Sequence, residues 1–230
     1  MERLKKTFRT EGPLSCSELL RLLQEIAAQD AARRGGGQAV LVSRGCTWVL
    51  VKNRLEISRW PQPGEELTLT TWPMKGRFAL YPRCMELRDA AGELLLSAEG
   101  IWAIMDIESR GMIRGEERGI ELDGVEEGRL RPQRRLSLPE GGERFPLTPR
   151  PEQIDENGHM NNAAYFDAVE PMLPAGLRGR RPRVICIDYE HEIPAGCSAA
   201  VRVVREGESC WFEGSMGDKV CFRLREDFAV

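Results

Sequence analysis

Residues 155–162 bring acid, amide and imidazole side chains together in the run Asp155-Glu156-Asn157-Gly158-His159-Met160-Asn161-Asn162. His159 is one of only two histidines, and an imidazole can exchange a proton near neutral pH without a large pKa shift. Asp155 could orient that ring or hold a water molecule, and the amide of Asn157 can donate and accept hydrogen bonds at once. This set suits proton transfer. The competing interpretation is a loop of polar residues that only caps a helix.

The residues that follow this run are expected to form a helix over 161–173, which Pro174 stops. Asn161 or Asn162 is the expected N-cap. The first turn of a helix offers unpaired N–H groups and the positive end of the helix dipole, and both favour negative charge. We therefore expect the start of this helix to bind an oxyanion of the substrate.

A second acidic cluster, residues 188–192, ends a strand predicted over 183–192. Strand alternation places Glu190 and Glu192 on one face and His191 on the other, with the apolar residues. For either carboxylate taken alone, a solvated strand end is the competing interpretation.

Other chemistries lack support in the sequence. The seven cysteines are odd in number and contain no C-x-x-C pair, so we expect neither a disulfide framework nor a metal site, and no cofactor. Nucleophile-elbow, phosphate-loop and dinucleotide motifs are absent. The formal charge of 33 − 36 = −3 argues against a nucleic-acid-binding surface, and no apolar run approaches the ~20 residues that cross a bilayer. Free thiols and an N-terminus without an apolar signal segment predict a cytoplasmic protein that does not act at a membrane.

The elements that must position these groups follow a repeated order. A helix is predicted after Ser15, which with Glu18 forms a capping-box signature, and it ends at the glycines 35–37. An edge strand is expected before this helix. Alternating strands follow it, and their predicted ranges are 47–58, 67–71, 78–89 and 93–105. The second half is expected to repeat this order, with strands at 145–147, 183–192, 199–206, 209–216 and 219–226.

The two halves are therefore interpreted as duplicated units. We expect an N-terminal unit over 1–114, a linker over 115–143 that is rich in Gly, Glu and Arg, and a C-terminal unit over 144–230. A common offset aligns residues 55–64 with 187–196, which places Trp60 opposite Glu192. If the halves are duplicates, only the second half has kept acid, amide and imidazole groups at the aligned positions. This asymmetry predicts one active unit and one that binds something else.

These residues resemble the acyl-acyl carrier protein thioesterases, the bacterial relatives of the plant enzymes that end fatty-acid synthesis. The resemblance runs from about Cys46 to Val203 and is strongest in Asp-x-Asn-Gly-His-x-Asn-Asn-x-x-Tyr at 155–165, followed by Tyr-x-x-Glu at 189–192. The first half contributes three further runs, which are Trp48-Val49-Leu50, Ile57-Ser58-Arg59-Trp60-Pro61 and Trp102-Ala103-Ile104-Met105-Asp106.

The resemblance implies an α+β double hotdog fold, in which each of two tandem units is a long helix wrapped by a curved antiparallel sheet. It also implies that the second unit carries the catalytic group and that the first unit forms the acyl-chain pocket. The implied catalytic residues are Asp155, Asn157, His159 and Glu192. Many plant members have Cys after the glutamate, but here the residue is Ile193, so water is the expected nucleophile.

The resulting hypothesis is hydrolysis of an acyl-acyl carrier protein thioester, which releases free fatty acid and terminates fatty-acid synthesis. Glu192 is the first choice of general base, with His159 close behind. Asn157 would hold the water or the substrate carbonyl, and Asp155 would orient the Asn and His side chains. The residues expected to bind substrate are Asn161, Asn162, Trp48, Leu19, Leu23 and Trp102, although the apolar ones could be core alone.

The partners expected are a fatty acyl thioester and the acidic carrier protein, which would dock on the arginine runs 129–135 and 178–183. A monomer and a homodimer both remain open. An acyl-coenzyme A thioesterase and a non-catalytic acyl-binding module are the alternatives, and a hotdog dehydratase has no specific support.

Overall fold

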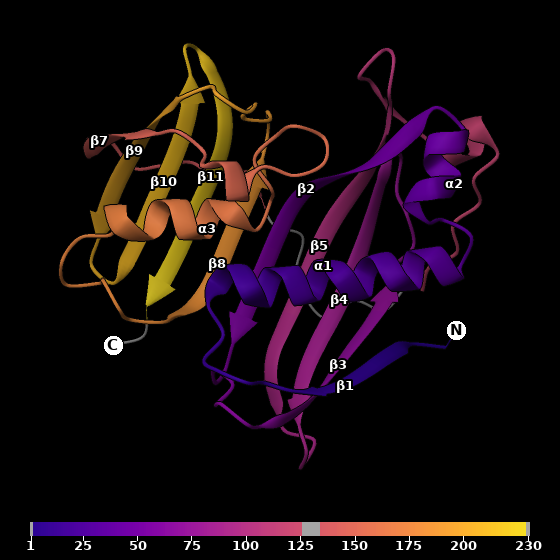
Figure 1. Ribbon diagram of the computed structural model, residues 1–230, viewed down its shortest axis with the longest axis horizontal. Helices are drawn as coiled ribbons and strands as arrows, with labels where there is room; N and C mark the ends of the chain where they lie inside the picture. Colours follow the sequence, from indigo (N-terminus) through magenta and orange to yellow (C-terminus); the bar gives the residue numbers. More distant parts are fainter. Residues whose placement is uncertain (1, 126–133, 229–230) are drawn as a thin grey trace. The chain divides into compact units, whose positions relative to one another are not determined.

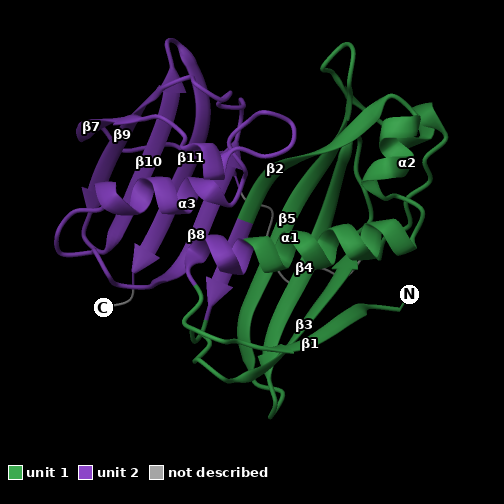
Figure 2. Ribbon diagram, in the orientation of Figure 1, with its two compact units in different colours: residues 1–14, 21–53, 58–132 green, residues 15–20, 54–57, 133–230 purple. Residues whose placement is uncertain are grey.

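A computed structural model describes residues 2–125 and 134–228. By its internal contacts the chain divides into two compact units (Figure 2). Unit 1 comprises residues 1–14, 21–53 and 58–132, and unit 2 comprises residues 15–20, 54–57 and 133–230. The two units are described separately. The predicted boundaries after residues 114 and 143 remain a prediction.

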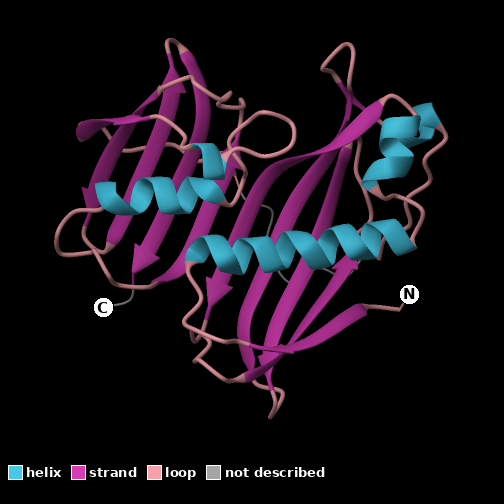
Figure 3. Ribbon diagram, viewed as in Figure 1, coloured by secondary structure: helices cyan, strands magenta, loops and turns pink. Residues whose placement is uncertain are grey.

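Unit 1 places residues 21–33 of helix α1 (Cys16–Arg33) across one face of an antiparallel sheet, together with a short helix α2 (Gln38–Ser43) (Figures 1 and 3). Its strands are β1 (Leu4–Arg9), β2 (Cys46–Ile57, of which residues 46–53 belong to this unit), β3 (Glu66–Pro73), β4 (Leu80–Asp89), β5 (Leu94–Asp106) and β6 (Met112–Ile113). The strand order is β1-β3-β4-β5-β2, and β6 pairs with β5. A 3-10 helix, η1 (Gly115–Arg118), follows β6.

The start of α1 confirms the predicted capping box. The Ser15 Oγ accepts the Glu18 amide at 3.1 Å, and the Glu18 carboxylate accepts the Ser15 amide at 2.7 Å. These bonds satisfy two N–H groups that a helix start leaves unpaired. The apolar side chains that recur at helical spacing are buried, namely Leu19, Leu20, Leu23, Ile26 and Ala27.

Unit 2 repeats the strand order of unit 1. Its strands are β7 (Glu143–Leu147), β8 (Pro182–Tyr189), β9 (Ala199–Glu206), β10 (Ser209–Met216) and β11 (Lys219–Phe228), in the order β7-β9-β10-β11-β8. In each unit the second strand therefore lies at one edge beside the fifth. The short helix α3 (Ala164–Val169) packs on this sheet, and the Tyr165 ring contacts Phe222 at a centroid distance of 4.7 Å. The expected helix-and-sheet duplication is confirmed.

The predicted helix over 161–173 is wrong in its extent. The α-helix begins at Ala164 and ends at Val169, and a 3-10 turn, η3 (Glu170–Met172), follows. At the start, the Asn161 side chain accepts the Ala163 amide at 2.9 Å, which holds the backbone in a turn in place of a helix. At the end, Pro171 cannot donate an amide hydrogen bond, so the α-helix stops.

The strand predicted over 183–192 is also too long, because β8 ends at Tyr189. The amides of Glu190 and His191 both donate to the Cys221 carbonyl, at 2.8 and 3.0 Å. Because two consecutive residues donate to one carbonyl, their side chains no longer alternate between the two faces of the strand, as in a β-bulge. The predicted sharing of one strand face by Glu190 and Glu192 is therefore wrong.

No described helix has both the length and the apolar content needed to cross a membrane. In the expected linker, residues 126–133 lie outside the described part, and so do five residues of the arginine run 129–135. The flanking residues on both sides are hydrogen-bonded within their own unit. Gly115 donates to the Tyr81 hydroxyl at 2.7 Å, and Leu136 donates to Asp188 at 2.8 Å.

Candidate active site

His159 and Glu192 form the centre of the candidate site. The His159 Nε2 lies 3.3 Å from the Glu192 Oε2, and both side chains are partly exposed, at 25% and 39%. Their two segments pair through the backbone, because His159 bridges Pro194 and Met160 donates to the Ile193 carbonyl at 2.9 Å. Two residues separated by more than thirty positions in the sequence thus meet as an acid–imidazole pair that water can reach.

Asp155 organises the turn that presents His159. Its Oδ1 accepts the backbone amides of Asn157 and His159, at 2.9 and 3.4 Å. Gly158 has a φ of +78°, in the left-handed region, and this conformation lets the chain reverse direction just before His159. Asp155 therefore fixes the backbone on which the two functional residues stand, whereas the sequence predicted contacts with their side chains. The Asn157 side chain is exposed beside this turn.

Asn161 and Asn162 serve the backbone as well. Ala163 donates to the Asn161 side chain and Ala164 donates to the Asn161 carbonyl, both at 2.9 Å. The amides of Ala163 and Ala164 therefore already have acceptors in the turn before α3. The oxyanion site expected at the start of this helix stays a prediction. The Asn162 carbonyl accepts the Tyr189 hydroxyl at 2.8 Å.

Tyr165 is the last residue of the run 155–165 that resembles the family, and it lies beneath the candidate site. It is 2% exposed and contacts the rings of Tyr189 and Phe222 at 5.6 and 4.7 Å. Burial raises the pKa of Tyr165 well above its usual value, and the nearby acidic groups, Glu192 among them, raise it further. The phenol therefore stays neutral and supports the site by packing. The sequence placed Tyr165 in the motif but gave no reason for its role.

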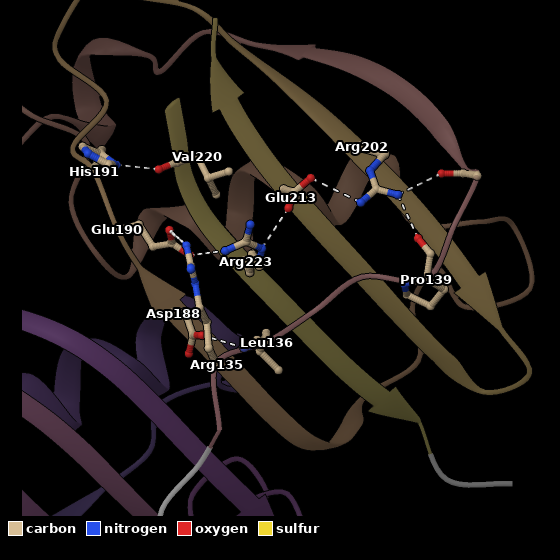
Figure 4. Close-up of polar contacts among 11 residues, drawn as sticks. Arg135, Leu136, Pro139, Asp188, Glu190, His191, Arg202, Glu213, Val220 and Arg223 are labelled. Carbon is tan, nitrogen blue, oxygen red and sulfur yellow. Dashed lines mark hydrogen bonds and ion pairs between the residues drawn. The ribbon is translucent and has the colours of Figure 1, made fainter. Parts of the chain in front are cut away.

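A charged network holds the start of the loop that carries Glu192 (Figure 4). The Glu190 carboxylate forms ion pairs with Arg135 and Arg223. Burial would raise the pKa of Glu190, but the hydrogen bond from Arg135 and the charge of Arg223 outweigh it and lower that pKa. Since the His191 Nδ1 also lies 2.7 Å from the Val220 carbonyl oxygen, the chain just before Glu192 is fixed to β11.

Arg135 belongs to a segment, residues 134–142, that we call the strap. It runs over one face of the unit 2 sheet (Figure 4). Arg202 on β9 donates to the carbonyls of Pro139 and Gly141 at 2.8 and 3.2 Å. Glu213 on β10 joins Arg202 to Arg223, at 3.2 and 2.8 Å. The strap thus connects three strands of this sheet to the loop that carries Glu192. Sequence reasoning placed Arg135 in a run expected to dock the carrier protein and did not find this role.

The predicted acyl-pocket residues divide between the units. Leu19 belongs to unit 2, and Leu23, Trp48 and Trp102 belong to unit 1. Leu19 and Leu23 are core residues, at 1% and 2% exposed. Trp48 packs edge-on against Tyr81 at 5.4 Å and donates from Nε1 to the Gly36 carbonyl at 2.8 Å. Trp102 has a buried Nε1 without a hydrogen-bond partner.

Within the described ranges, no group of three or more His, Cys, Asp or Glu side chains is arranged to hold a metal ion. All seven cysteines are free. Cys221, the one that accepts the amides of Glu190 and His191 through its carbonyl, is fully buried, and burial raises the pKa of its thiol. A buried thiol with a raised pKa is a poor nucleophile, because the thiolate is the reactive form.

Comparisons with known proteins identify the family of this chain. The family model of the acyl-ACP thioesterase N-terminal domain matches residues 7–118, and that of the C-terminal domain matches residues 137–215. The chloroplastic acyl-[acyl-carrier-protein] hydrolase FATB3 of Cuphea viscosissima is 27% identical over 169 residues, which are 66% of this chain and 40% of that protein. The chain thus spans less than half the length of this curated relative.

Two solved structures share the fold. An acyl-ACP thioesterase from Bacteroides thetaiotaomicron superposes with a TM-score of 0.85 at 22% identity, over 99% of this chain and 98% of that one. The 12:0-ACP thioesterase from Umbellularia californica gives a TM-score of 0.84 at 20% identity, over 99% and 97%. The expected double hotdog fold is confirmed. With both domain models matched in order along most of its length, the chain belongs to the acyl-ACP thioesterase family.

Proposed function

We propose that this protein hydrolyses the thioester of acyl-acyl carrier protein and releases free fatty acid, which terminates fatty-acid synthesis. The observation that carries the proposal is the His159–Glu192 pair at 3.3 Å, held on a backbone-paired loop of unit 2. Family membership and the hydrolase relatives support it. The reaction needs a positioned base, a water molecule and a proton donor for the leaving sulfur.

In the proposed mechanism, Glu192 takes a proton from water while the water oxygen bonds to the thioester carbonyl carbon. The carbonyl electrons move to oxygen and form a tetrahedral oxyanion. When this intermediate collapses, the C–S bond breaks, the electron pair leaves with sulfur, and a proton passes to it through His159. The products are the free acid and the thiol of the carrier.

The remaining residues of the site have positioning roles in this mechanism. The exposed amide of Asn157 is the proposed donor to the substrate carbonyl or to the attacking water. Asp155 keeps Asn157 and His159 in place through their backbone amides. Ile193 stands where many plant members have Cys, and its side chain is fully buried and has no nucleophilic atom. Water therefore remains the proposed nucleophile.

The carrier protein is the proposed partner, and it would dock on exposed arginines. Several members of the predicted arginine runs also make internal contacts. Arg178 donates to the Leu173 carbonyl at 2.7 Å, and Arg180 pairs with Glu208. Arg134 and Arg181 are exposed and are the proposed contacts for an acidic carrier. We also propose a monomer or homodimer in the cytoplasm, where the seven free thiols would stay reduced.

The deciding experiment measures acid release from matched acyl chains carried on acyl carrier protein and on coenzyme A. We expect a much higher kcat/KM with the carrier. Arg134→Glu with Arg181→Glu should raise KM for the carrier substrate, and added salt should raise the wild-type KM in the same way. A double substitution at exposed acidic residues, Glu206→Gln with Asp218→Asn, is the control. Faster release from coenzyme A would replace this function with acyl-coenzyme A hydrolysis, and no release from either would leave a binding module.

A further inference from the structure

Trp102 lies on the face of the unit 1 sheet that α1 covers. The orientation follows from register, because Arg83 pairs with Gly100 and Tyr81 pairs with Trp102 across β4 and β5. Arg83 donates to Asp30 on α1 at 2.6 Å, so its strand face is the one toward that helix. Directly paired residues, and residues two positions apart on one strand, share a face. The Trp102 ring therefore belongs to the interior of unit 1.

The indole nitrogen of Trp102 is a buried donor without an acceptor. Trp48 provides a contrast, because its indole nitrogen donates to the Gly36 carbonyl at 2.8 Å. A buried N–H with no acceptor costs free energy, so native proteins rarely retain one without a use. The Trp102 side chain as a whole is only partly buried.

A second hydrogen-bonding group lies beside this donor. A Cβ atom added at Gly100 would stand 2.9 Å from the Asn53 Oδ1 and 3.1 Å from the Trp102 Nε1. Glycine at this position is thus what lets an amide acceptor and an indole donor approach the same stretch of backbone. Asn53 is only 4% exposed. The donor and the acceptor together match a hydroxyl group, which both accepts and donates.

The surrounding surface is apolar. On the same face, Met85 pairs with Ala98 and Leu87 pairs with Leu96, and all four are at most 3% exposed. A hydrocarbon chain that reached the Trp102 ring would leave its N–H donor unpaired. A chain that carries an oxygen at the right carbon would satisfy it.

We propose that unit 1 binds an acyl chain bearing a hydroxyl group, with Trp102 donating to the hydroxyl oxygen and Asn53 accepting its proton. The proposal rests on the proposed function, which supplies the acyl thioester, and it defines the substrate class as hydroxyacyl thioesters. Discrimination against the unsubstituted chain follows, because that chain leaves the buried Trp102 donor unpaired.

The test compares hydroxyacyl and unsubstituted acyl thioesters of equal length, with the hydroxyl moved along the chain. We expect wild-type kcat/KM to favour one hydroxyl position by about tenfold or more. Trp102→Phe keeps the aromatic ring and removes the N–H, so it should abolish that preference. Trp48→Phe is the matched control, since it removes an indole N–H that already has a protein acceptor, and it should keep the ratio between the two substrates.

A binding measurement separates this proposal from the proposed function. The indole N–H resonance of Trp102, assigned by its loss in Trp102→Phe, should shift with a free hydroxy fatty acid and not with the unsubstituted acid. This result would support the site even if no thioester were hydrolysed. An equal effect of both acids, or an equal loss on both substrates in Trp102→Phe, would overturn the hydroxyl site and leave hydrolysis untouched.

Discussion

His159 bridges Pro194 through the backbone, and this pairing delivers its ring to Glu192, two residues before Pro194. The acid–imidazole pair is thus produced by main-chain pairing between two loops and not by side-chain attraction alone. The pair therefore depends on the hydrogen bonds that fix those two loops.

Removing either partner of the pair should nearly abolish hydrolysis. We expect His159→Ala and Glu192→Gln each to lower kcat by about 10²–10⁴, because each removes a positioned proton-transfer group. The double variant should be little worse than the poorer single variant, since the two residues act on one proton path. Steady-state kinetics on acyl-carrier substrate, with circular dichroism as the folding control, measures this. Full activity in either single variant would remove the pair from the mechanism.

Asp155 should act through hydrogen-bond acceptance more than through charge. Asp155→Ala removes the acceptor for the amides of Asn157 and His159, so we expect at least a tenfold loss of kcat with the fold retained. Asp155→Asn keeps an acceptor oxygen at the same place and should recover most of the rate. An Asn variant as inactive as the Ala variant would instead indicate that the negative charge is needed.

Glu190 should contribute stability that depends on pH. Its pKa is lowered by Arg135 and Arg223, so the ionised form is favoured by folding. The contribution is fully present above the unfolded pKa of about 4.3 and is lost as the pH falls through the lower folded value. Wild type should therefore exceed Glu190→Gln in the free energy of unfolding at pH 7, and the two should converge toward pH 3. Glu206→Gln, at an exposed glutamate, is the control.

Glu226 should show the opposite pH dependence. Burial, and to a lesser extent Glu170, raises the pKa of Glu226 to about 8. The folded state then binds a proton that the unfolded state has lost, so stability falls as the pH rises from about 4.3 to 8, by at most about 1.4 kcal/mol per pH unit. Glu226→Gln should flatten this fall and stabilise the protein at pH 8. Denaturant unfolding at several pH values measures it, and parallel curves for variant and wild type would contradict it.

The sequence predicted what local patterns control. Alternation located β2, β3, β4 and β5, and the box at Ser15 and Glu18 located α1 because two side chains three residues apart satisfy its start. The two-residue strand β6 was not predicted. The errors arose where a non-local acceptor or a side chain competed with the pattern. The Cys221 carbonyl ends β8 early, and the Asn161 side chain delays α3.

The site was predictable as a set of residue types but not as a geometry. The spacing within 155–162 identified Asp155, Asn157 and His159, but no local pattern states that Asp155 binds amides and not rings. The strap was missed because its contacts join Arg135 to Glu190, 55 residues away. The unpaired Trp102 N–H could not be predicted either, because whether a donor has an acceptor depends on the residues that surround it in the fold.

Ser17 donates to the Ala163 carbonyl at 2.8 Å across 146 residues of sequence. Both residues belong to unit 2, which includes residues 15–20 at the start of α1. During synthesis on the ribosome, Ser17 emerges long before its acceptor exists. Unit 2 therefore cannot complete its hydrogen bonding until most of the chain has been translated, and a protein fragment made from its C-terminal residues alone lacks this donor. The first turn of α1 is thus synthesised early but can form this hydrogen bond only late in synthesis.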